Sequence, residues 1–248
     1  MLKLLENKFN VVCIILARGG SKSIPRKNLI DFCGKPLLVW SIGQALGSRY
    51  IKSVFVSSDS NEILCFAKKA GAGVILRPKQ IAGDRASSED ALLHALVEVE
   101  RRQQEKISIV VFLQATSPLR TPEDIDQAIE VFISKKADSL FSATRLEDFC
   151  LWQRNGQQWK SLNFDYRNRG RRQERDPLFL ENGSIYIFKP NALRQLGNRL
   201  GGKITVYLMP FWKSYEIDEP SDVELCRYFM MNKILNCLKA SKTRKVNK

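Results

Sequence analysis

The sequence lacks the residues needed for several common kinds of site. It has one histidine among its 248 residues, which excludes a site built on two histidines. Its six cysteines lie far apart and form no Cys-x-x-Cys pair, so neither a zinc site nor a disulfide framework is expected, and the pattern is typical of a reducing compartment. No stretch offers the roughly 18 uninterrupted apolar residues of a membrane-spanning helix, and residues 1–8 lack the apolar core of a secretion signal. We therefore expect a cytoplasmic protein with no membrane partner.

Positive charge, by contrast, is in excess. The 40 lysines and arginines outnumber the 26 acidic residues and give a net charge of +14. Part of this excess follows Phe229, where basic residues occur without acidic ones, and residues 239–248 form a basic tail. A basic body fits a nucleic-acid-binding protein, and it equally fits a pocket for a polyanion such as a nucleoside triphosphate. Charge alone leaves both classes open.

Short strand-like runs alternate along the chain with helix-like segments. This alternation predicts an α/β fold with a Rossmann-like, mostly parallel sheet and helices on both faces. In such sheets, ligands bind beyond the carboxyl ends of the strands. The expected strands are 11–16, 53–57, 73–76, 109–113, 139–143, 184–188 and 204–208, and the expected helices are 36–42, 61–70, 87–104, 121–135 and 220–238.

Residues 145–180 interrupt this alternation. They are polar, and Trp152 and Trp159 flank Asn155-Gly156, a dipeptide typical of a β-hairpin turn. A hairpin that stands off a parallel sheet has nothing of its own against which to bury its aromatic side chains. We therefore expect a protruding dimerisation arm and a homodimer, with a disordered loop as the alternative.

The loop after the first expected strand combines glycines with positive charge. Residues 16–28 read LARGGSKSIPRKN, which matches neither the Walker A pattern nor GxGxxG. Its glycines let backbone N–H groups approach phosphate oxygens, and its four cations balance their charge. These cations are Arg18, Lys22, Arg26 and Lys27. The loop therefore predicts a triphosphate site at the carboxyl end of a strand.

Five sequence blocks between about residues 10 and 230 extend this interpretation. They are ARGGSKSIPRKN with GKPL (17–28 and 34–37), LRP with Asp84 and Ser87-Ser88, LQATSPLR (113–120), Arg171-Arg172-Gln173 with ENGSIY (181–186), and SYEID (214–218). In these blocks and their order the chain resembles the CMP-sialic acid synthetases, the acylneuraminate cytidylyltransferases. The resemblance implies a single cytidylyltransferase domain over 8–238, with the dimerisation arm inserted at about 145–180. It also implies a nucleotidyltransferase that activates a sialic-acid-type nonulosonate with CTP and releases pyrophosphate.

The resemblance further implies a role for individual residues. Lys27 would be catalytic by offsetting charge at the α-phosphate, and Arg172 would be catalytic from the dimer arm. The nucleotide would contact Arg18, Lys22, Asn28, Arg77 and Ser88. The sugar would contact Gln114, Arg172 and Gln173.

The SYEID block supplies the expected metal ligands, Asp218 and Glu216. The family usually has Asp-Ile-Asp here, two carboxylates on the same face of an extended segment. Mg²⁺ prefers hard oxygen ligands and keeps several waters, so Glu216 can still serve, although it is one methylene longer. No residue stands out as a general base.

Two other functions remain open at this point. One is a cytidylyltransferase for Kdo or another sugar, although the Kdo enzymes carry a different first loop without the Arg-Lys-Asn found here at 26–28. The other is a basic nucleic-acid-binding protein, which would need a binding motif that is not recognisable here. The favoured interpretation has CTP, an acidic nine-carbon sugar and a second copy of the chain as partners, and no nucleic acid.

Overall fold

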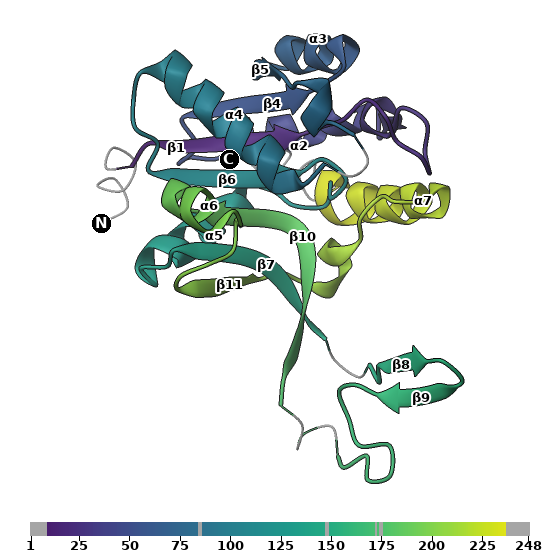
Figure 1. Ribbon diagram of the computed structural model, residues 1–248. Coiled ribbons are helices and arrows are strands. Elements are labelled where there is room, and N and C mark those ends of the chain that lie inside the picture. The colour runs from purple at the N-terminus through teal and green to yellow at the C-terminus, as the bar shows by residue number, and fades with distance from the viewer. Residues whose placement is uncertain (1–8, 84–85, 147–148, 172, 174–175, 237–248) are drawn as a thin grey trace, which may run out of the picture.

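The structure, a computed structural model, describes residues 9–83, 86–146, 149–171, 173 and 176–236 (Figure 1). At its centre is a seven-stranded sheet. All pairs of neighbouring strands are parallel except the two pairs that β10 forms, with β7 and with β6, which are antiparallel. The strands follow the order β11 (Ile204–Leu208), β7 (Ser139–Leu146), β10 (Leu178–Phe188), β6 (Ile109–Gln114), β1 (Val11–Leu16), β4 (Ser53–Ser58) and β5 (Gly73–Leu76). The predicted mostly parallel α/β sheet is confirmed.

The central strands are buried on both faces, as their unbroken apolar sequences indicate. In β1, Val12 and Ile14 face one side of the sheet while Cys13 and Ile15 face the other, and all four are 0% exposed. Both faces therefore need a cover of helices.

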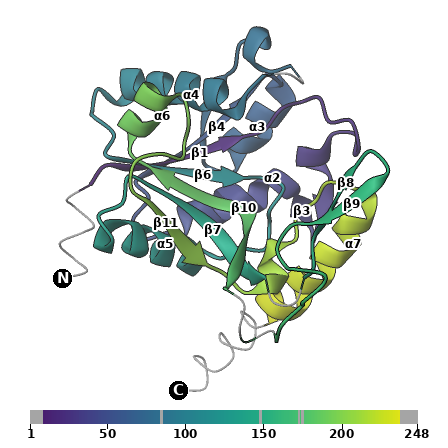
Figure 2. The same cartoon turned by 60° about the horizontal axis from the view of Figure 1, so that its bottom comes forward.

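Two groups of helices supply this cover. The helices α2 (Leu37–Leu46), α3 (Asn61–Lys69) and α5 (Pro122–Ser134) pack on the Cys13 face, and α4 (Ser88–Gln103) and α6 (Pro190–Leu196) pack on the Val12 face. Figure 2 shows α4 and α6 on one side of the sheet and α5 on the other. Helices on both faces confirm the prediction, but α6 is an addition to it. It is a short helix that begins at Pro190 and ends at Leu196, and it is capped by Gly197, where φ is 61°.

The C-terminal elements pack beside the loop that follows β1. They are η4 (Phe211–Ser214), α7 (Pro220–Phe229) and the π-helical η5 (Met230–Leu235). Cys226 and Met230 join Ile24 and Phe32 in a third apolar cluster. The predicted helix over 220–238 thus becomes π-helical at Met230, and its last two residues and the basic tail 239–248 lie outside the described residues.

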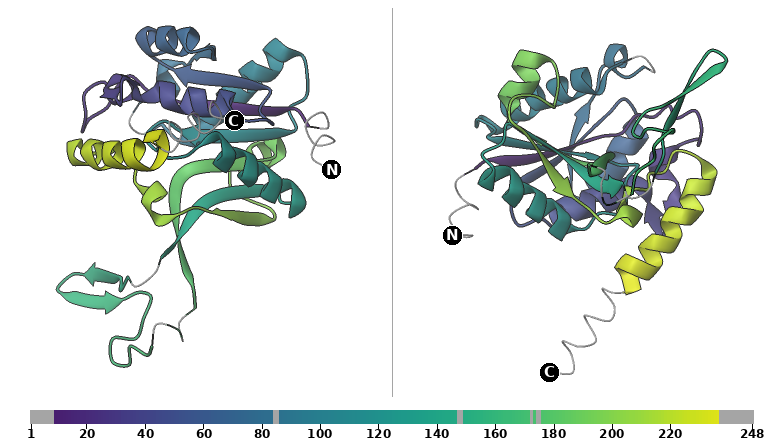
Figure 3. Two further views of the ribbon diagram at one scale, coloured as in Figure 1. Left: turned by 180° about the vertical axis from the view of Figure 1, so that it is seen from behind. Right: turned by 90° about the horizontal axis from the view of Figure 1, so that it is seen from below.

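The predicted hairpin is present at the end of a long two-stranded ribbon. The carboxyl half of β7 and the amino half of β10 pair beyond the sheet, from Ala143–Glu181 to Leu146–Leu178. Beyond them, β8 (Trp152–Asn155) and β9 (Gln158–Ser161) stand apart from the body (Figure 1; Figure 3, left). Because Asn155 pairs with Gln158, the two turn residues are Gly156 and Gln157 instead of the expected Asn155 and Gly156.

This arm exposes many apolar side chains. Those with more than a third of their surface exposed are Phe149, Leu151, Trp152, Trp159, Leu162, Tyr166, Leu178, Phe179 and Leu180. Exposed apolar clusters of this kind mark contact surfaces. The role of the arm in dimerisation stays a prediction. Within the described ranges, no helix has the length and apolarity to cross a membrane.

Candidate active site

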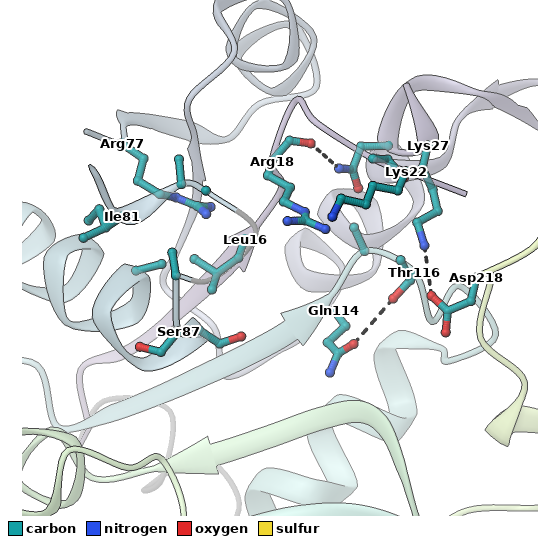
Figure 4. Close-up of a pocket in the computed structure, with 18 of the residues that line it drawn as sticks. Leu16, Arg18, Lys22, Lys27, Arg77, Ile81, Ser87, Gln114, Thr116 and Asp218 are labelled. Atoms are coloured by element: carbon teal, nitrogen blue, oxygen red, sulfur yellow. Dashed lines mark hydrogen bonds and ion pairs between the residues drawn. The ribbon is translucent and has the colours of Figure 1, made fainter. Parts of the chain in front are cut away.

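A cavity of about 550 Å³ opens where several parallel strands end (Figure 4). Its walls include Leu16 at the end of β1, Gln114 at the end of β6, Arg77 just after β5 and Ser88 at the start of α4. Because the strands run in one direction, their carboxyl ends bring these residues to one edge of the sheet. The cavity therefore lies where the strand order predicts a ligand.

The loop after β1 places three of its four cations in this cavity. Arg18, Lys22 and Lys27 line it, and Figure 4 shows Arg18 and Lys22 directed inward. Arg26 instead has a left-handed backbone conformation with φ of 54° and forms an ion pair with Glu62. The loop thus concentrates positive charge on one side of the cavity.

Hydrogen bonds hold this loop in its conformation. Nδ2 of Asn28 donates to the carbonyl oxygen of Arg18 at 3.0 Å, and the backbone N–H of Gly19 donates to Oδ1 of Asp59 at 2.9 Å. Asn28, predicted to contact the nucleotide, is largely buried at the cavity wall, and its amide also braces the loop. These bonds preorganise the loop before any ligand enters.

Arg77 and Ser88 approach the cavity from the other side. Arg77 is buried, and it donates from Nη2 to the carbonyl of Ser57 at 2.6 Å and from Nε to the Ser57 hydroxyl at 3.1 Å. Burial lowers the pKa of Arg77. Ser87 caps α4, so Ser88 lies in the first turn, where free backbone N–H groups favour an anion. Asp84, from the same block, lies outside the described residues.

The SYEID segment brings negative charge to the cation-rich loop. Nζ of Lys27 donates to Oδ1 of Asp218 at 2.9 Å and to the carbonyl of Ile217 at 3.0 Å. The Lys27 side chain is 14% exposed and that of Asp218 is 71% exposed, so the carboxylate faces the open cavity. The Ser23 hydroxyl donates to the carbonyl of Asp218 and fastens the two segments together.

Glu216 lies deeper than Asp218. Burial, followed by the charge of Asp218, raises the pKa of Glu216 to about 7, although Arg120 and Lys27 oppose the rise. A divalent cation near these carboxylates would offset their repulsion. No group of three or more His, Cys, Asp or Glu ligands occurs within the described ranges, so such an ion would take its remaining ligands from water or phosphate, as Mg²⁺ does. The donor set fits the predicted metal.

A bulge in β10 makes room for the Glu216 side chain. The pairing of β10 with β7 shifts between Glu181 and Tyr186, and Gly183 within this bulge has φ of 62°. A Cβ on Gly183 would lie 2.1 Å from Oε1 of Glu216 and 3.3 Å from Nε2 of Gln114. The glycine thus lets Glu216 and Gln114 pack against the strand backbone, and bulges of this kind are frequent beside active sites.

Comparison with known proteins shows the family to which the chain belongs. Residues 12–242 match the sequence model of a family described as cytidylyltransferase. The chain belongs to the cytidylyltransferase family. Members of this family generally use a divalent metal ion.

Two curated relatives illustrate the range of this family. The chain is 34% identical over 226 residues to N-acylneuraminate cytidylyltransferase A of Danio rerio, an alignment that covers 87% of this chain and 49% of that protein. It is 34% identical over 223 residues to the pseudaminic acid cytidylyltransferase of Campylobacter jejuni, with 87% and 94% covered. This cytidylyltransferase therefore spans about half the length of the fish relative and almost all of the bacterial one.

Solved structures support the fold of this cytidylyltransferase. A CMP:2-keto-3-deoxy-manno-octonic acid synthetase complexed with CTP matches with a TM-score of 0.68 and 19% identity, covering 91% of this chain and all of that one. A 4-diphosphocytidyl-2C-methyl-D-erythritol synthase matches with a TM-score of 0.65 and 12% identity over 90% of this chain and all of that one. At these identities the likeness is one of fold alone.

Arg120 is a buried residue next to the site of this cytidylyltransferase, and the sequence assigned no role to it. It is fully buried and donates to the carbonyls of Ser117 (2.6 Å), Gln114 (2.9 Å) and Ser184 (3.1 Å) and to the hydroxyl of Ser41 (2.5 Å). Burial lowers its pKa to about 10. Arg120 thus ties the end of β6 to β10, and its charge opposes the rise in the pKa of Glu216. The sequence offered one signal for Arg120: it is the only charged residue of the LQATSPLR block (113–120), which begins at the end of a predicted strand.

Two predicted site residues, Arg172 and Gln173, belong to the arm of the cytidylyltransferase. Gln173 is exposed and is not among the residues that line the cavity of its own chain. Arg172 lies outside the described residues. The predicted contact of both residues with sugar or phosphate stays a prediction.

Proposed function

We propose that this cytidylyltransferase transfers CMP from CTP to a sialic-acid-type nonulosonate and releases pyrophosphate. The observation that carries the proposal is the cavity itself, in which Arg18, Lys22 and Lys27 face the carboxylate of Asp218 at the carboxyl edge of the sheet. Cations on one side suit a triphosphate, and carboxylates on the other suit its metal ion. The relatives at 34% identity are named for acylneuraminate and pseudaminic acid, which supports this class of sugar.

The roles of the basic residues follow from their positions. Arg18 and Lys22 would bind the triphosphate, with Arg77 and the amino terminus of α4 approaching from the opposite wall. Lys27 lies between the loop and Asp218, so its ammonium would offset charge that develops at the α-phosphate. The anomeric hydroxyl of the sugar would attack the α-phosphorus, and the bond to pyrophosphate would break. Catalysis on this scheme depends on positioning and electrostatics.

Asp218 and Glu216 would hold Mg²⁺. A bound Mg²⁺ polarises phosphoryl oxygens and stabilises negative charge on them. Gln114 would orient the sugar, because its amide lies beside Glu216 at the end of β6. Gln173 and Arg172 would reach the sugar or phosphates of a partner subunit.

We further propose a homodimer formed through the arm at about 145–180, within a single cytidylyltransferase domain over 8–238 that acts in the cytoplasm. The exposed apolar residues of the arm support the dimer, because a partner would cover them. The alternative substrate, Kdo, has weaker support, since the Kdo enzyme resembles this chain at 19% identity, in fold alone.

The test is pyrophosphate release with each of the four ribonucleoside triphosphates, in the presence of N-acetylneuraminate, pseudaminate or Kdo. We expect release with CTP and one of the first two sugars, and a background rate without sugar. A preference for Kdo would favour the alternative substrate. Tight binding of RNA or DNA without pyrophosphate release from any pair would overturn the proposal in favour of nucleic-acid binding.

A further inference from the structure

Asp218 follows a residue that is firmly anchored. The Ile217 side chain is fully buried in the third apolar cluster. The N–H of Ile217 donates to the carbonyl oxygen of Thr116 at 2.8 Å, and its carbonyl oxygen accepts from Nζ of Lys27 at 3.0 Å. The segment is therefore fixed up to Ile217, and the position of the next carboxylate depends on how the chain continues.

Two side chains hold the main chain of Asp218 itself. Its N–H donates to Oδ2 of Asp222 at 2.9 Å, and its carbonyl oxygen accepts from the hydroxyl of Ser23, which lines the cavity. The Asp218 side chain, by contrast, is 71% exposed beside Lys27, so packing does little to orient it (Figure 4). The place of its carboxylate is therefore determined mainly by the two bonds to its main chain.

The bond from Asp222 extends a helix cap toward the cavity. Asp222 lies in the first turn of α7, and its Oδ2 also accepts from the N–H of Glu219 at 2.7 Å. The Glu219 side chain accepts in return from the N–H of Asp222, which completes a capping box. A capping box needs only this exchange. The bond to the N–H of Asp218 is an addition that ties the expected metal ligand to the start of α7.

We propose that Ser23 and Asp222 are positioning residues for the metal site, because they hold the main chain of Asp218 and so keep its carboxylate where Mg²⁺ would bind. Ser23 also joins the cation-rich loop to the carboxylate segment, so the two sides of the site keep a fixed separation. Residues that orient a metal ligand without touching the metal contribute about 10–100-fold to metal affinity or activity. The proposal rests on the proposed function, since it assumes that Asp218 binds the metal.

Substitutions can separate this role from charge and from helix capping. Ser23→Ala removes the hydroxyl without changing the charge, and Ser23→Thr keeps the hydroxyl. Asp222→Ala removes the acceptor, whereas Asp222→Asn removes the charge but keeps an oxygen that can accept. Glu219→Ala is the matched control, because it removes one charge and one capping bond from the same helix and leaves the bond between Asp222 and Asp218 in place.

The experiment measures binding of Mn²⁺ alone, which shares the preference of Mg²⁺ for oxygen ligands, from the electron paramagnetic resonance signal of the free ion. We expect Ser23→Ala and Asp222→Ala each to raise the Kd for Mn²⁺ about tenfold or more. Ser23→Thr, Asp222→Asn and Glu219→Ala should keep a Kd close to that of the wild type. Asp222→Ala and Glu219→Ala should both lower the melting temperature, since each opens the capping box. The Mg²⁺ titration of pyrophosphate release should shift in the same order as the Kd.

The variants also show which part of the reasoning fails. An unchanged Kd in Ser23→Ala or in Asp222→Ala would overturn the role of that residue. An equal rise in Glu219→Ala would overturn positioning by Asp222, because charge or the stability of α7 would then explain the effect. If the wild type and Asp218→Asn bind Mn²⁺ equally, Asp218 is not a ligand, and the metal site of the proposed function fails before this proposal is reached. The two failures are therefore distinguishable.

Discussion

Glu216 is expected to destabilise the metal-free protein above neutral pH. Its pKa is 4.5 in an ordinary setting and about 7 in the folded chain, because burial and the charge of Asp218 disfavour its ionised form. Below pH 4.5 the side chain is protonated in both the folded and the unfolded state and contributes nothing. Between pH 4.5 and about 7 the unfolded state ionises first, so stability falls as the pH rises, and the full cost applies above pH 7.

The change from 4.5 to about 7 corresponds to about 3 kcal/mol at most. Glu216 retains contact with solvent, which screens its charge, so we expect about 1–2 kcal/mol. Glu216→Gln removes the ionisation while keeping the size of the side chain. In EDTA, the variant should therefore unfold in urea with a free energy about 1–2 kcal/mol above that of the wild type at pH 8.5, and the difference should vanish near pH 4.5.

Glu224→Gln is the control, because Glu224 is an exposed carboxylate on α7 and its substitution should not reproduce this pH dependence. Mg²⁺ should raise the stability of the wild type at pH 8.5 and that of Glu216→Gln less, since a ligand that binds the folded state stabilises it. A loss of stability in Glu216→Gln at pH 8.5, or a gain independent of pH, would refute the reasoning.

Three further predictions concern activity and assembly. Lys27→Ala should lower kcat by about 10²-fold, the scale for one charge-stabilising donor, while circular dichroism shows an intact fold. Arg26→Ala, in the same loop but with its ion pair outside the cavity, should keep a kcat near that of the wild type. If both variants lower kcat equally, Lys27 has no specific catalytic role. Asp218→Asn should shift the Mg²⁺ titration of pyrophosphate release to higher concentration more than Glu216→Gln does, and the opposite order would make Glu216 the stronger ligand. Deletion of residues 151–160 should convert a dimer into monomers with lower activity, as measured by sedimentation, and a wild type that sediments as a monomer at micromolar concentration would contradict the dimer.

Most of the sheet could be predicted from the sequence because its central strands carry unbroken apolar runs. The direction of β10 could not be predicted, because its carboxyl half is buried on both faces and so has the same unbroken run of buried residues as the parallel strands. The helix α6 spans only Pro190–Leu196, too few residues to display helical periodicity. Pro190 at its start and Gly197 just after its end were the sequence features that could have indicated this helix.

The candidate site was predictable where one short segment supplies several groups. Arg18, Lys22 and Lys27 meet in the cavity because a single tight loop carries them. Arg26 turns away because its left-handed backbone directs it to Glu62, which no residue pattern reveals. Arg120 is held by Ser41, Gln114 and Ser184 from three separate elements, so only the folded chain reveals its position.

The reversed strand β10 also determines where the arm can grow. Because β10 runs against β7, the chain leaves the sheet on one strand and returns on its immediate neighbour, at the same edge as the cavity. Residues added to or removed from the arm lengthen or shorten this ribbon without shifting the register of the sheet. The bulge at Gly183 separates the ribbon from the sheet pairing, so the sequence and length of the arm can change while the carboxylate beside that glycine keeps its place.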